Sequence, residues 1–236
     1  MKLPARMKES GDGMERITQE VKLEVVQRIE MKYRLYLPQD YRRDEAATWP
    51  LVVFLHGAGE RGNDPQRLGV HGIPREADEG REFPFLILAP QCPEPSVWIM
   101  QQDQVMELIS RICRDYRVDP QRIYLTGISM GGFGTWEIAM TYPEVFAAIV
   151  PICGGGMSWR ADRLLSTPIW TFHGGKDDVV PLVYTEEMVR ALRVLGNPVQ
   201  FTVYPEAGHD CWTEVYQRED IYEWLLEQYL PTKLLM

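Results

Sequence analysis

The sequence predicts an α/β fold with a mostly parallel central sheet of about eight strands and helices on both faces. Two observations lead to this prediction. From position 51 onward, short continuous apolar runs recur, as in strands that are buried on both sides of a parallel sheet. Helix-length segments separate most of these runs, and that alternation is typical of strand–helix–strand units. Such helices can cover both faces of the sheet.

The composition fits a single globular domain over residues 1–236. With 45% hydrophobic and 25% charged residues, the chain can bury a sizeable core. Its formal net charge of -9 would repel phosphate groups rather than neutralise them. We therefore expect neither nucleic acid nor a membrane surface as a partner, and nothing in the sequence specifies an oligomeric state.

The start of the chain predicts a polar, loosely ordered leader over residues 1–18. No apolar segment follows the few early cations, so we expect neither a signal peptide nor a transmembrane span. The four cysteines form no C-x-x-C pair and are expected to stay reduced. Cys211 lies near His209, but such a pair is far short of a metal ligand set, so no metal or cofactor is expected. These features predict a cytoplasmic protein.

Two alternating segments near the start, residues 21–26 and 32–37, predict antiparallel strands at a sheet edge. Continuous apolar runs predict six further strands, at residues 51–55, 85–89, 122–126, 146–152, 168–172 and 200–204. Helices are expected at residues 101–116, 131–142, 182–195 and 212–228. The stretch 57–81 has no clear apolar period and predicts a long loop. Because ligands bind beyond the carboxyl ends of parallel strands, this loop and the irregular stretch 154–156 should border a site.

One strand leads directly into the pattern of a catalytic turn. Residues 123–132 read as an apolar strand, then G-x-S-x-G, then the start of a helical pattern. In such a turn the residues beside the serine cannot carry bulk, which explains Gly127 and Gly131. The pattern therefore predicts Ser129 as a nucleophile that is held out into the site.

A serine hydroxyl needs a histidine base and a carboxylate that orients the imidazole. The chain has four histidines: His56, His71, His173 and His209. The order serine, acid, histidine along the chain excludes His56 and His71. His173 ends a predicted strand and its best acids follow it, whereas His209 lies in a turn between the last strand and the final helix. We predict His209 as the base.

Two adjacent carboxylates, Asp177 and Asp178, lie in the loop after the penultimate strand. Spacing alone does not separate them. We expect one to face the base and the other to cap the helix that begins near position 181 or 182. Glu206 and Asp210 are rivals, although a neighbour so close in sequence rarely orients a histidine in this arrangement.

Acyl transfer places negative charge on the carbonyl oxygen, and each preorganised N–H donor that meets it contributes about 2.7–4 kcal/mol. The residue after the nucleophile, Met130, is one expected donor. The loop after the strand at 51–55 should supply the other, and Ala58 is the first choice with Gly57 second. His56 is interpreted as a structural residue that hydrogen-bonds within this loop.

Three tryptophans, Trp98, Trp159 and Trp212, lie in or beside predicted loops on the catalytic side. An aromatic wall there could receive an aryl or sugar group. With seven tryptophans in the chain, packing in the core or at the rim is the more common role. Trp98 and Trp212 are the candidate substrate-binding residues.

The segments 55–62, 89–93, 127–132 and 173–177 together resemble serine esterases of the prolyl-oligopeptidase-like group, related to feruloyl and acetyl-xylan esterases. The resemblance covers the chain after about Lys32 and implies an α/β-hydrolase fold. In these proteins H-G-x-x-D-x-x-V-P carries the triad acid, which implies Asp177 rather than Asp178. The family's G-H-x-x-W falls on residues 208–212 and implies His209 as the base.

The resemblance implies a serine carboxylesterase that hydrolyses small-molecule esters, with short-chain acyl or aryl groups of the feruloyl type, through an acyl-enzyme. Dienelactone hydrolases look similar but carry a cysteine where this chain has Ser129. The chain is too short for the propeller of prolyl oligopeptidases, and a small serine peptidase stays an alternative. A non-catalytic scaffold that binds a small ligand is the other alternative, but such a scaffold should lack a triad residue and none is missing here.

Overall fold

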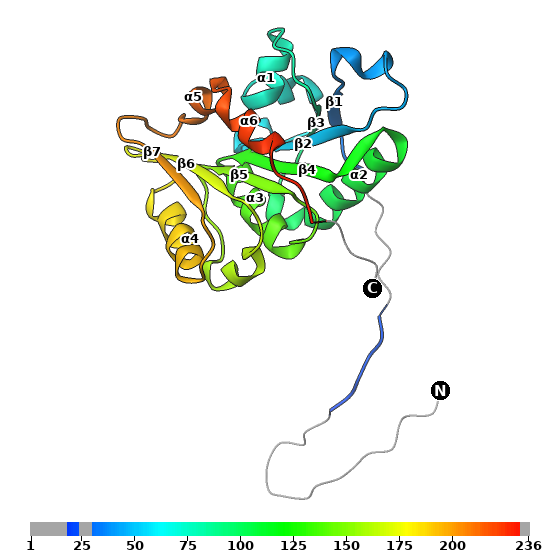
Figure 1. Cartoon of the computed structure of the whole chain (residues 1–236). Helices are drawn as coiled ribbons and strands as arrows, with labels where there is room; N and C mark the ends of the chain where they lie inside the picture. Colours follow the sequence, from blue (N-terminus) through cyan, green and yellow to red (C-terminus); the bar gives the residue numbers. More distant parts are fainter. Residues whose placement is uncertain (1–17, 24–29, 232–236) are drawn as a thin grey trace, which may run out of the picture.

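The computed structural model describes residues 18–23 and 30–231. In this part of the chain a single seven-stranded sheet runs through the centre, with helices above and below it (Figure 1). The order across the sheet is β1-β3-β2-β4-β5-β6-β7, with β1 antiparallel to β3 and the other pairs parallel. The strands are β1 (Tyr33–Tyr36), β2 (Trp49–Leu55), β3 (Leu86–Pro90), β4 (Val118–Ile128), β5 (Ala148–Ile152), β6 (Trp170–Gly174) and β7 (Gln200–Tyr204).

The helices cover both faces of the sheet, which confirms the predicted class. One layer holds α2 (Gln102–Asp115), α3 (Met130–Thr141) and α4 (Val183–Val194), and the other holds α1 (Gly72–Asp78), α5 (Trp212–Gln217) and α6 (Asp220–Leu226) (Figure 1). Strand β2 shows why both layers form. Its side chains alternate, so that Leu51, Val53 and Leu55 join one apolar core while Val52 and Phe54 join the other.

The edge strand predicted at residues 21–26 does not form in those of its residues that the structure describes. Residues 21–23 lie outside any strand, and positions 24–26 fall outside the described residues. The second predicted edge segment does form β1, but its partner is β3. The described sheet therefore has seven strands instead of about eight. The predicted polar leader, apart from position 18, also lies outside the described residues.

Two predictions about helices were wrong. The stretch 57–81 is not one long loop, because it contains α1, which starts at Gly72 with a positive φ of 66°. The expected helix at 212–228 is interrupted at Arg218, whose backbone is extended. The Arg218 guanidinium donates to both carboxylate oxygens of Asp220, and this bidentate contact accompanies the break between α5 and α6.

No helix in the ranges that the structure describes is both long and apolar enough to cross a membrane.

The four cysteines are present as free thiols.

Candidate active site

The turn between β4 and α3 holds Ser129 in a strained backbone conformation, with φ 53° and ψ -118°. Non-glycine residues seldom adopt such angles, and they cluster at functional sites. The strain is maintained by close backbone packing. A Cβ on Gly131 would lie 1.9 Å from the Leu55 carbonyl oxygen, and a Cβ on Gly127 would lie 2.5 Å from that of Gly131. The Ser129 N–H donates to the Ile152 carbonyl, which ties the turn to β5.

The structure brings together the three residues that the sequence suggests for a triad. His209 Nε2 lies 2.9 Å from Ser129 Oγ, and His209 Nδ1 lies 2.7 Å from Asp177 Oδ2. They come from three connections at the carboxyl ends of parallel strands, β4–α3, β6–α4 and β7–α5. With Nδ1–H donated to the carboxylate, Nε2 is free to accept the serine proton, as a general base requires.

Asp177 is fixed on both carboxylate oxygens, and its side chain has no exposed surface. Its second oxygen, Oδ1, accepts the backbone N–H groups of Val179 at 3.0 Å and Val180 at 2.8 Å. Burial opposes ionisation, but the hydrogen bond from His209 and the two N–H donors outweigh it and lower the pKa of Asp177. Asp177 is thus held as a carboxylate, which is the form that orients an imidazolium.

The rival carboxylates do not face His209. Asp178 is exposed, and helix α4 has no side-chain cap, so the expected capping role for Asp178 was wrong. Glu206 pairs with Lys176. Asp210 accepts hydrogen bonds from the Thr213 N–H and hydroxyl groups, at 3.2 and 2.8 Å, in the first turn of α5.

A second histidine, His173, also contacts Asp177. His173 is fully buried at the end of β6, and its Nε2 lies 2.8 Å from the Val180 carbonyl and 3.2 Å from Asp177 Oδ2. Its Nδ1 lies 2.8 Å from Thr185 Oγ1. Burial lowers the pKa of His173. The sequence favoured His209 over His173 as the base but gave no signal of this contact, because the contact depends on how the β6–α4 loop turns back over its own strand.

The loop after β2 approaches the nucleophile at Gly57. A Cβ on Gly57 would lie 3.8 Å from Ser129 Cβ. Ala58 follows as an exposed residue and opens a short 3-10 helix, η2 (Ala58–Glu60). Met130 begins α3, where backbone N–H groups have no intrahelical acceptor. Met130 therefore adjoins Ser129 in the chain, and Gly57, the second choice for the other donor, lies close to Ser129 in space.

His56 stabilises this loop through hydrogen bonds, as expected of a structural residue. Its Nδ1–H donates to the Gly57 carbonyl at 2.6 Å, and its Nε2 accepts the Cys92 N–H at 3.0 Å. Burial lowers the pKa of His56 to about 4. The imidazole therefore stays neutral and keeps one donor and one acceptor in place.

The tryptophans occupy three different environments. Trp98 is fully buried beneath the loop and donates its indole N–H to the His56 carbonyl, so its expected place in an open aromatic wall was wrong. Trp159 is 78% exposed. Trp212 is 7% exposed and packs edge-on against His209, with ring centroids 5.1 Å apart.

Cys153 lies beneath the triad, which the sequence did not suggest. It follows β5 with a positive φ of 40°, and its sulfur and the ligand atoms of Asp177 and His209 lie within 4.8 Å of one another. Burial raises the pKa of the Cys153 thiol well above its usual value. A metal ion here would have to replace the hydrogen bond between His209 and Asp177 and deprotonate this thiol, so the donor set suits a triad better than a metal site.

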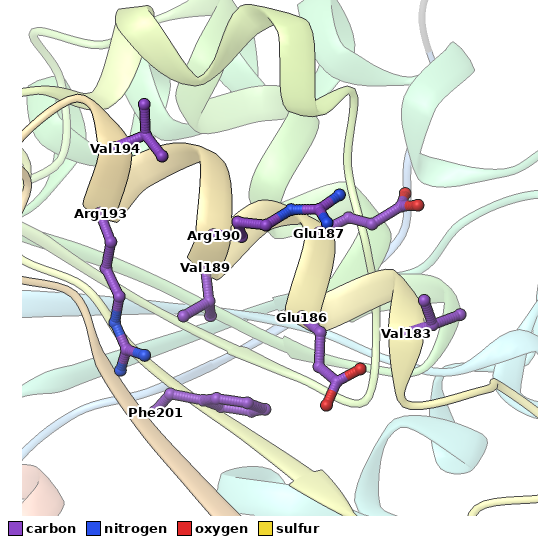
Figure 2. Close-up of a pocket in the computed structure, with 8 residues that line it drawn as sticks. All are labelled: Val183, Glu186, Glu187, Val189, Arg190, Arg193, Val194 and Phe201. Atoms are coloured by element: carbon purple, nitrogen blue, oxygen red, sulfur yellow. The ribbon is translucent and has the colours of Figure 1, made fainter.

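A separate groove lies away from these residues. It has a volume of about 700 Å³ and is lined by side chains of α4 and by Phe201 of β7 (Figure 2). No member of the Ser129, His209 and Asp177 group lines it.

Comparisons with known proteins identify the family of this chain. A family model described as Phospholipase/Carboxylesterase matches residues 73–225. The bifunctional acetylxylan esterase/xylanase of Neocallimastix patriciarum is 28% identical over 149 residues, which cover 61% of this chain and 22% of that protein. Feruloyl esterase B of Neurospora crassa is 29% identical over 142 residues, 54% of this chain and 47% of that protein. This chain therefore spans less than half the length of either curated relative.

Among solved structures, that of a thermostable esterase superposes with a TM-score of 0.75 at 36% sequence identity. The match covers 85% of this chain and 60% of that one. The resemblance to the feruloyl and acetyl-xylan esterase group is confirmed. Since the family model matches more than half of the residues, the chain belongs to the Phospholipase/Carboxylesterase family and has the α/β-hydrolase fold.

Proposed function

We propose that the protein is a serine carboxylesterase that works through an acyl-enzyme. The observation that supports this most strongly is the unbroken hydrogen-bonded path from Ser129 Oγ through His209 to Asp177. Each step of the path has the donor and acceptor that nucleophilic catalysis needs.

In the proposed mechanism, Ser129 Oγ attacks the ester carbonyl carbon while His209 Nε2 takes the hydroxyl proton. The oxyanion of the tetrahedral intermediate is held by the N–H groups of Met130 and Ala58. The carbon–oxygen bond to the alcohol then breaks, and His209 returns the proton to the departing alkoxide. A water molecule, deprotonated by His209, attacks the acyl-enzyme; the bond to Ser129 Oγ then breaks, and His209 returns the proton to that oxygen as the acid leaves. Asp177 stabilises the imidazolium in both halves of the reaction.

We further propose carboxylic esters with short-chain acyl or feruloyl-type aryl groups as substrates. Relatives named as an acetylxylan esterase and a feruloyl esterase support this range. Esters are also easier substrates than amides for such a triad, since an alkoxide leaves more readily than an amine.

The test uses p-nitrophenyl acetate and butyrate together with a fluorophosphonate probe. Wild-type protein should hydrolyse the esters and be labelled, and Ser129→Ala should lose both properties, with kcat lower by about five to six orders of magnitude. Ser110→Ala, an exposed serine on α2, is the matched control and should behave as wild type. Turnover that survives in Ser129→Ala would contradict the proposal.

A further inference from the structure

One oxygen of the triad acid is in contact with two histidines. His209 Nδ1 lies 2.7 Å from Asp177 Oδ2, and His173 Nε2 lies 3.2 Å from the same oxygen. The side chains of His173 and Asp177 have no exposed surface. The proposed reaction assigns no role to His173, although its ring is buried directly against the acid. Buried polar groups are nearly always paired for a physical reason, and the partners of this ring show what that reason is.

The contacts of His173 determine which ring nitrogen carries a proton. Besides Asp177 Oδ2, Nε2 lies 2.8 Å from the carbonyl oxygen of Val180. Asp177 is a carboxylate, as its lowered pKa indicates. A carbonyl oxygen and a carboxylate oxygen only accept hydrogen bonds, so a lone pair on Nε2 would face two acceptors. A proton on Nε2 satisfies both contacts, and we therefore assign the N–H to this nitrogen.

The other ring nitrogen fits this assignment. His173 Nδ1 lies 2.8 Å from Thr185 Oγ1, and the same hydroxyl group lies 2.6 Å from the carbonyl oxygen of Gly154. Burial lowers the pKa of His173 and favours the neutral ring. Nδ1 then accepts, and the hydroxyl proton of Thr185 lies between Nδ1 and the Gly154 carbonyl. The ring thus connects the acid to helix α4 and to the loop after β5.

His173 also stabilises the loop that carries the acid. Its Nε2–H donates to the carbonyl of Val180, and the N–H of the same Val180 donates to Asp177 Oδ1 at 2.8 Å. One oxygen of Asp177 is therefore held by the backbone of its own loop, and the other is held by the two histidines. With both oxygens bonded, the carboxylate cannot rotate away from His209 without breaking these contacts.

A donor on Oδ2 also changes the charge that His209 faces. A hydrogen bond to a carboxylate stabilises its charged form and disperses the negative charge. With less charge on Oδ2, the imidazolium form of His209 is stabilised less, so the base stays unprotonated at lower pH. We propose that His173 is a positioning residue, which holds Asp177 in place and extends the activity of the base His209 to lower pH. This inference rests on the proposed esterase function and adds a residue that sets its pH range.

The experiment measures kcat/KM for p-nitrophenyl butyrate as a function of pH, because the acid limb of this profile reports protonation of the base in the free enzyme. His173→Leu removes the N–H donor. The pH at which kcat/KM falls to half should then rise by about half a unit or more. On the plateau, kcat should fall about tenfold and KM should change less than about twofold, since the catalytic groups are misplaced while binding is not. The midpoint is independent of the fraction of folded protein.

Two further variants separate the hydrogen bond from the packing. His173→Gln is the conservative change, because its amide can place an N–H close to the position of Nε2. Its midpoint should return most of the way to the wild-type value. Thr185→Val is the matched control, since it removes the partner of Nδ1 and the contact with Gly154 but leaves Nε2 in place. It should lower Tm and leave the midpoint unchanged.

The pair formed by Asp177 and His209 has other titratable neighbours among the described residues, and these variants change none of them. Burial raises the pKa of the Cys153 thiol, which stays neutral throughout the acid limb. The other neighbours are Glu60 in η2, His71 before α1, Lys176 and Asp178 beside the acid, and Asp210 and Cys211 after the base. A shift that appears in His173→Leu and is absent from Thr185→Val therefore reports the N–H at position 173.

Nitrogen-15 NMR of the histidine rings in the wild-type protein gives a second readout, which does not depend on the folding of any variant. His173 should carry a proton on Nε2, and a proton on Nδ1 alone would overturn the inference. An unshifted midpoint in His173→Leu would also overturn it, as would an equal shift in His173→Gln or in Thr185→Val. A wild-type protein that does not hydrolyse the ester would instead overturn the proposed function, and this inference with it.

Discussion

Asp177 differs from its neighbour Asp178 in every contact that matters for catalysis. Its two oxygens accept bonds from the imidazole of His209 and from two backbone N–H groups, whereas Asp178 is exposed. This contrast allows a matched comparison of two changes of the same kind, one residue apart.

We predict that Asp177→Asn lowers kcat by about four orders of magnitude, because an amide presents a donor or an uncharged oxygen to Nδ1 and no longer stabilises the imidazolium. Asp178→Asn should stay within about twofold of wild type, as surface changes usually do. Steady-state hydrolysis of p-nitrophenyl butyrate measures both. The reverse outcome would move the acid to Asp178.

The nucleophile turn depends on a contact between two elements, the start of α3 and the end of β2. A Cβ on Gly131 would meet the backbone carbonyl oxygens of Leu55 at 1.9 Å and His56 at 2.8 Å. These are backbone atoms of buried residues at the end of β2 and just after it, so neither can move aside cheaply.

We predict that Gly131→Ala lowers the free energy of unfolding by about 3 kcal/mol or more, as severe overpacking does. In an ordinary helix the same change would stabilise by about 1 kcal/mol, so the expected sign is reversed. Urea denaturation followed by tryptophan fluorescence gives the value.

Gly59→Ala is the control for this measurement. No atom lies within 4 Å of a Cβ at that position, so its stability should change by less than about 0.5 kcal/mol. Equal stability of Gly131→Ala and wild type would show that β2 and α3 can separate in solution.

Elements that bury a continuous apolar run could be predicted from the sequence, and those that depend on single contacts could not. Strands β2 to β7 each overlap a predicted run. Helix α1 escaped prediction because it has only seven residues and buries three consecutive ones, so no helical period is visible. The break at Arg218 depends on side-chain contacts that no pattern encodes.

The same distinction applies to the candidate site: the residues in sequence motifs could be predicted, and the residues that contact them only through packing could not. Ser129, Asp177 and His209 stand in a chain order and in motifs that the sequence displays, and the structure brings them together. The contacts of His173 and Cys153 with this group arise from packing beneath it. Neither residue lies in a pattern that distinguishes it from an ordinary buried side chain.

For the molecule as a whole, the buried histidines link stability to pH. His56 accepts the Cys92 N–H at Nε2, so a proton on that nitrogen would place two donors face to face. Burial and this hydrogen bond favour the neutral ring, consistent with a pKa lowered from 6.5 to about 4. His173 is also buried, and its pKa is lowered in the same direction.

The direction of the effect follows from proton counts. Between the unfolded and folded pKa values of His56, the unfolded chain binds more protons, so the free energy of unfolding falls as the pH falls through this window. We predict a loss of about 2 kcal/mol from His56 alone between pH values of about 7 and 5, and about 3 kcal/mol once the pH is below 4. Asp177, whose pKa is lowered from 3.8, adds to the loss only at still lower pH.

Urea unfolding at these two pH values measures the loss, and His56→Gln provides the comparison. Whatever its own stability, this variant has no imidazole to protonate at position 56, so the difference between the two pH values should shrink by about 2 kcal/mol. An undiminished difference would mean that other groups control acid unfolding. Because His56 joins the loop after β2 to the end of β3, its protonation should also release the loop that carries Ala58. Loss of esterase activity by this route should therefore appear only as the pH approaches about 4, where His56 in the folded protein takes up its proton.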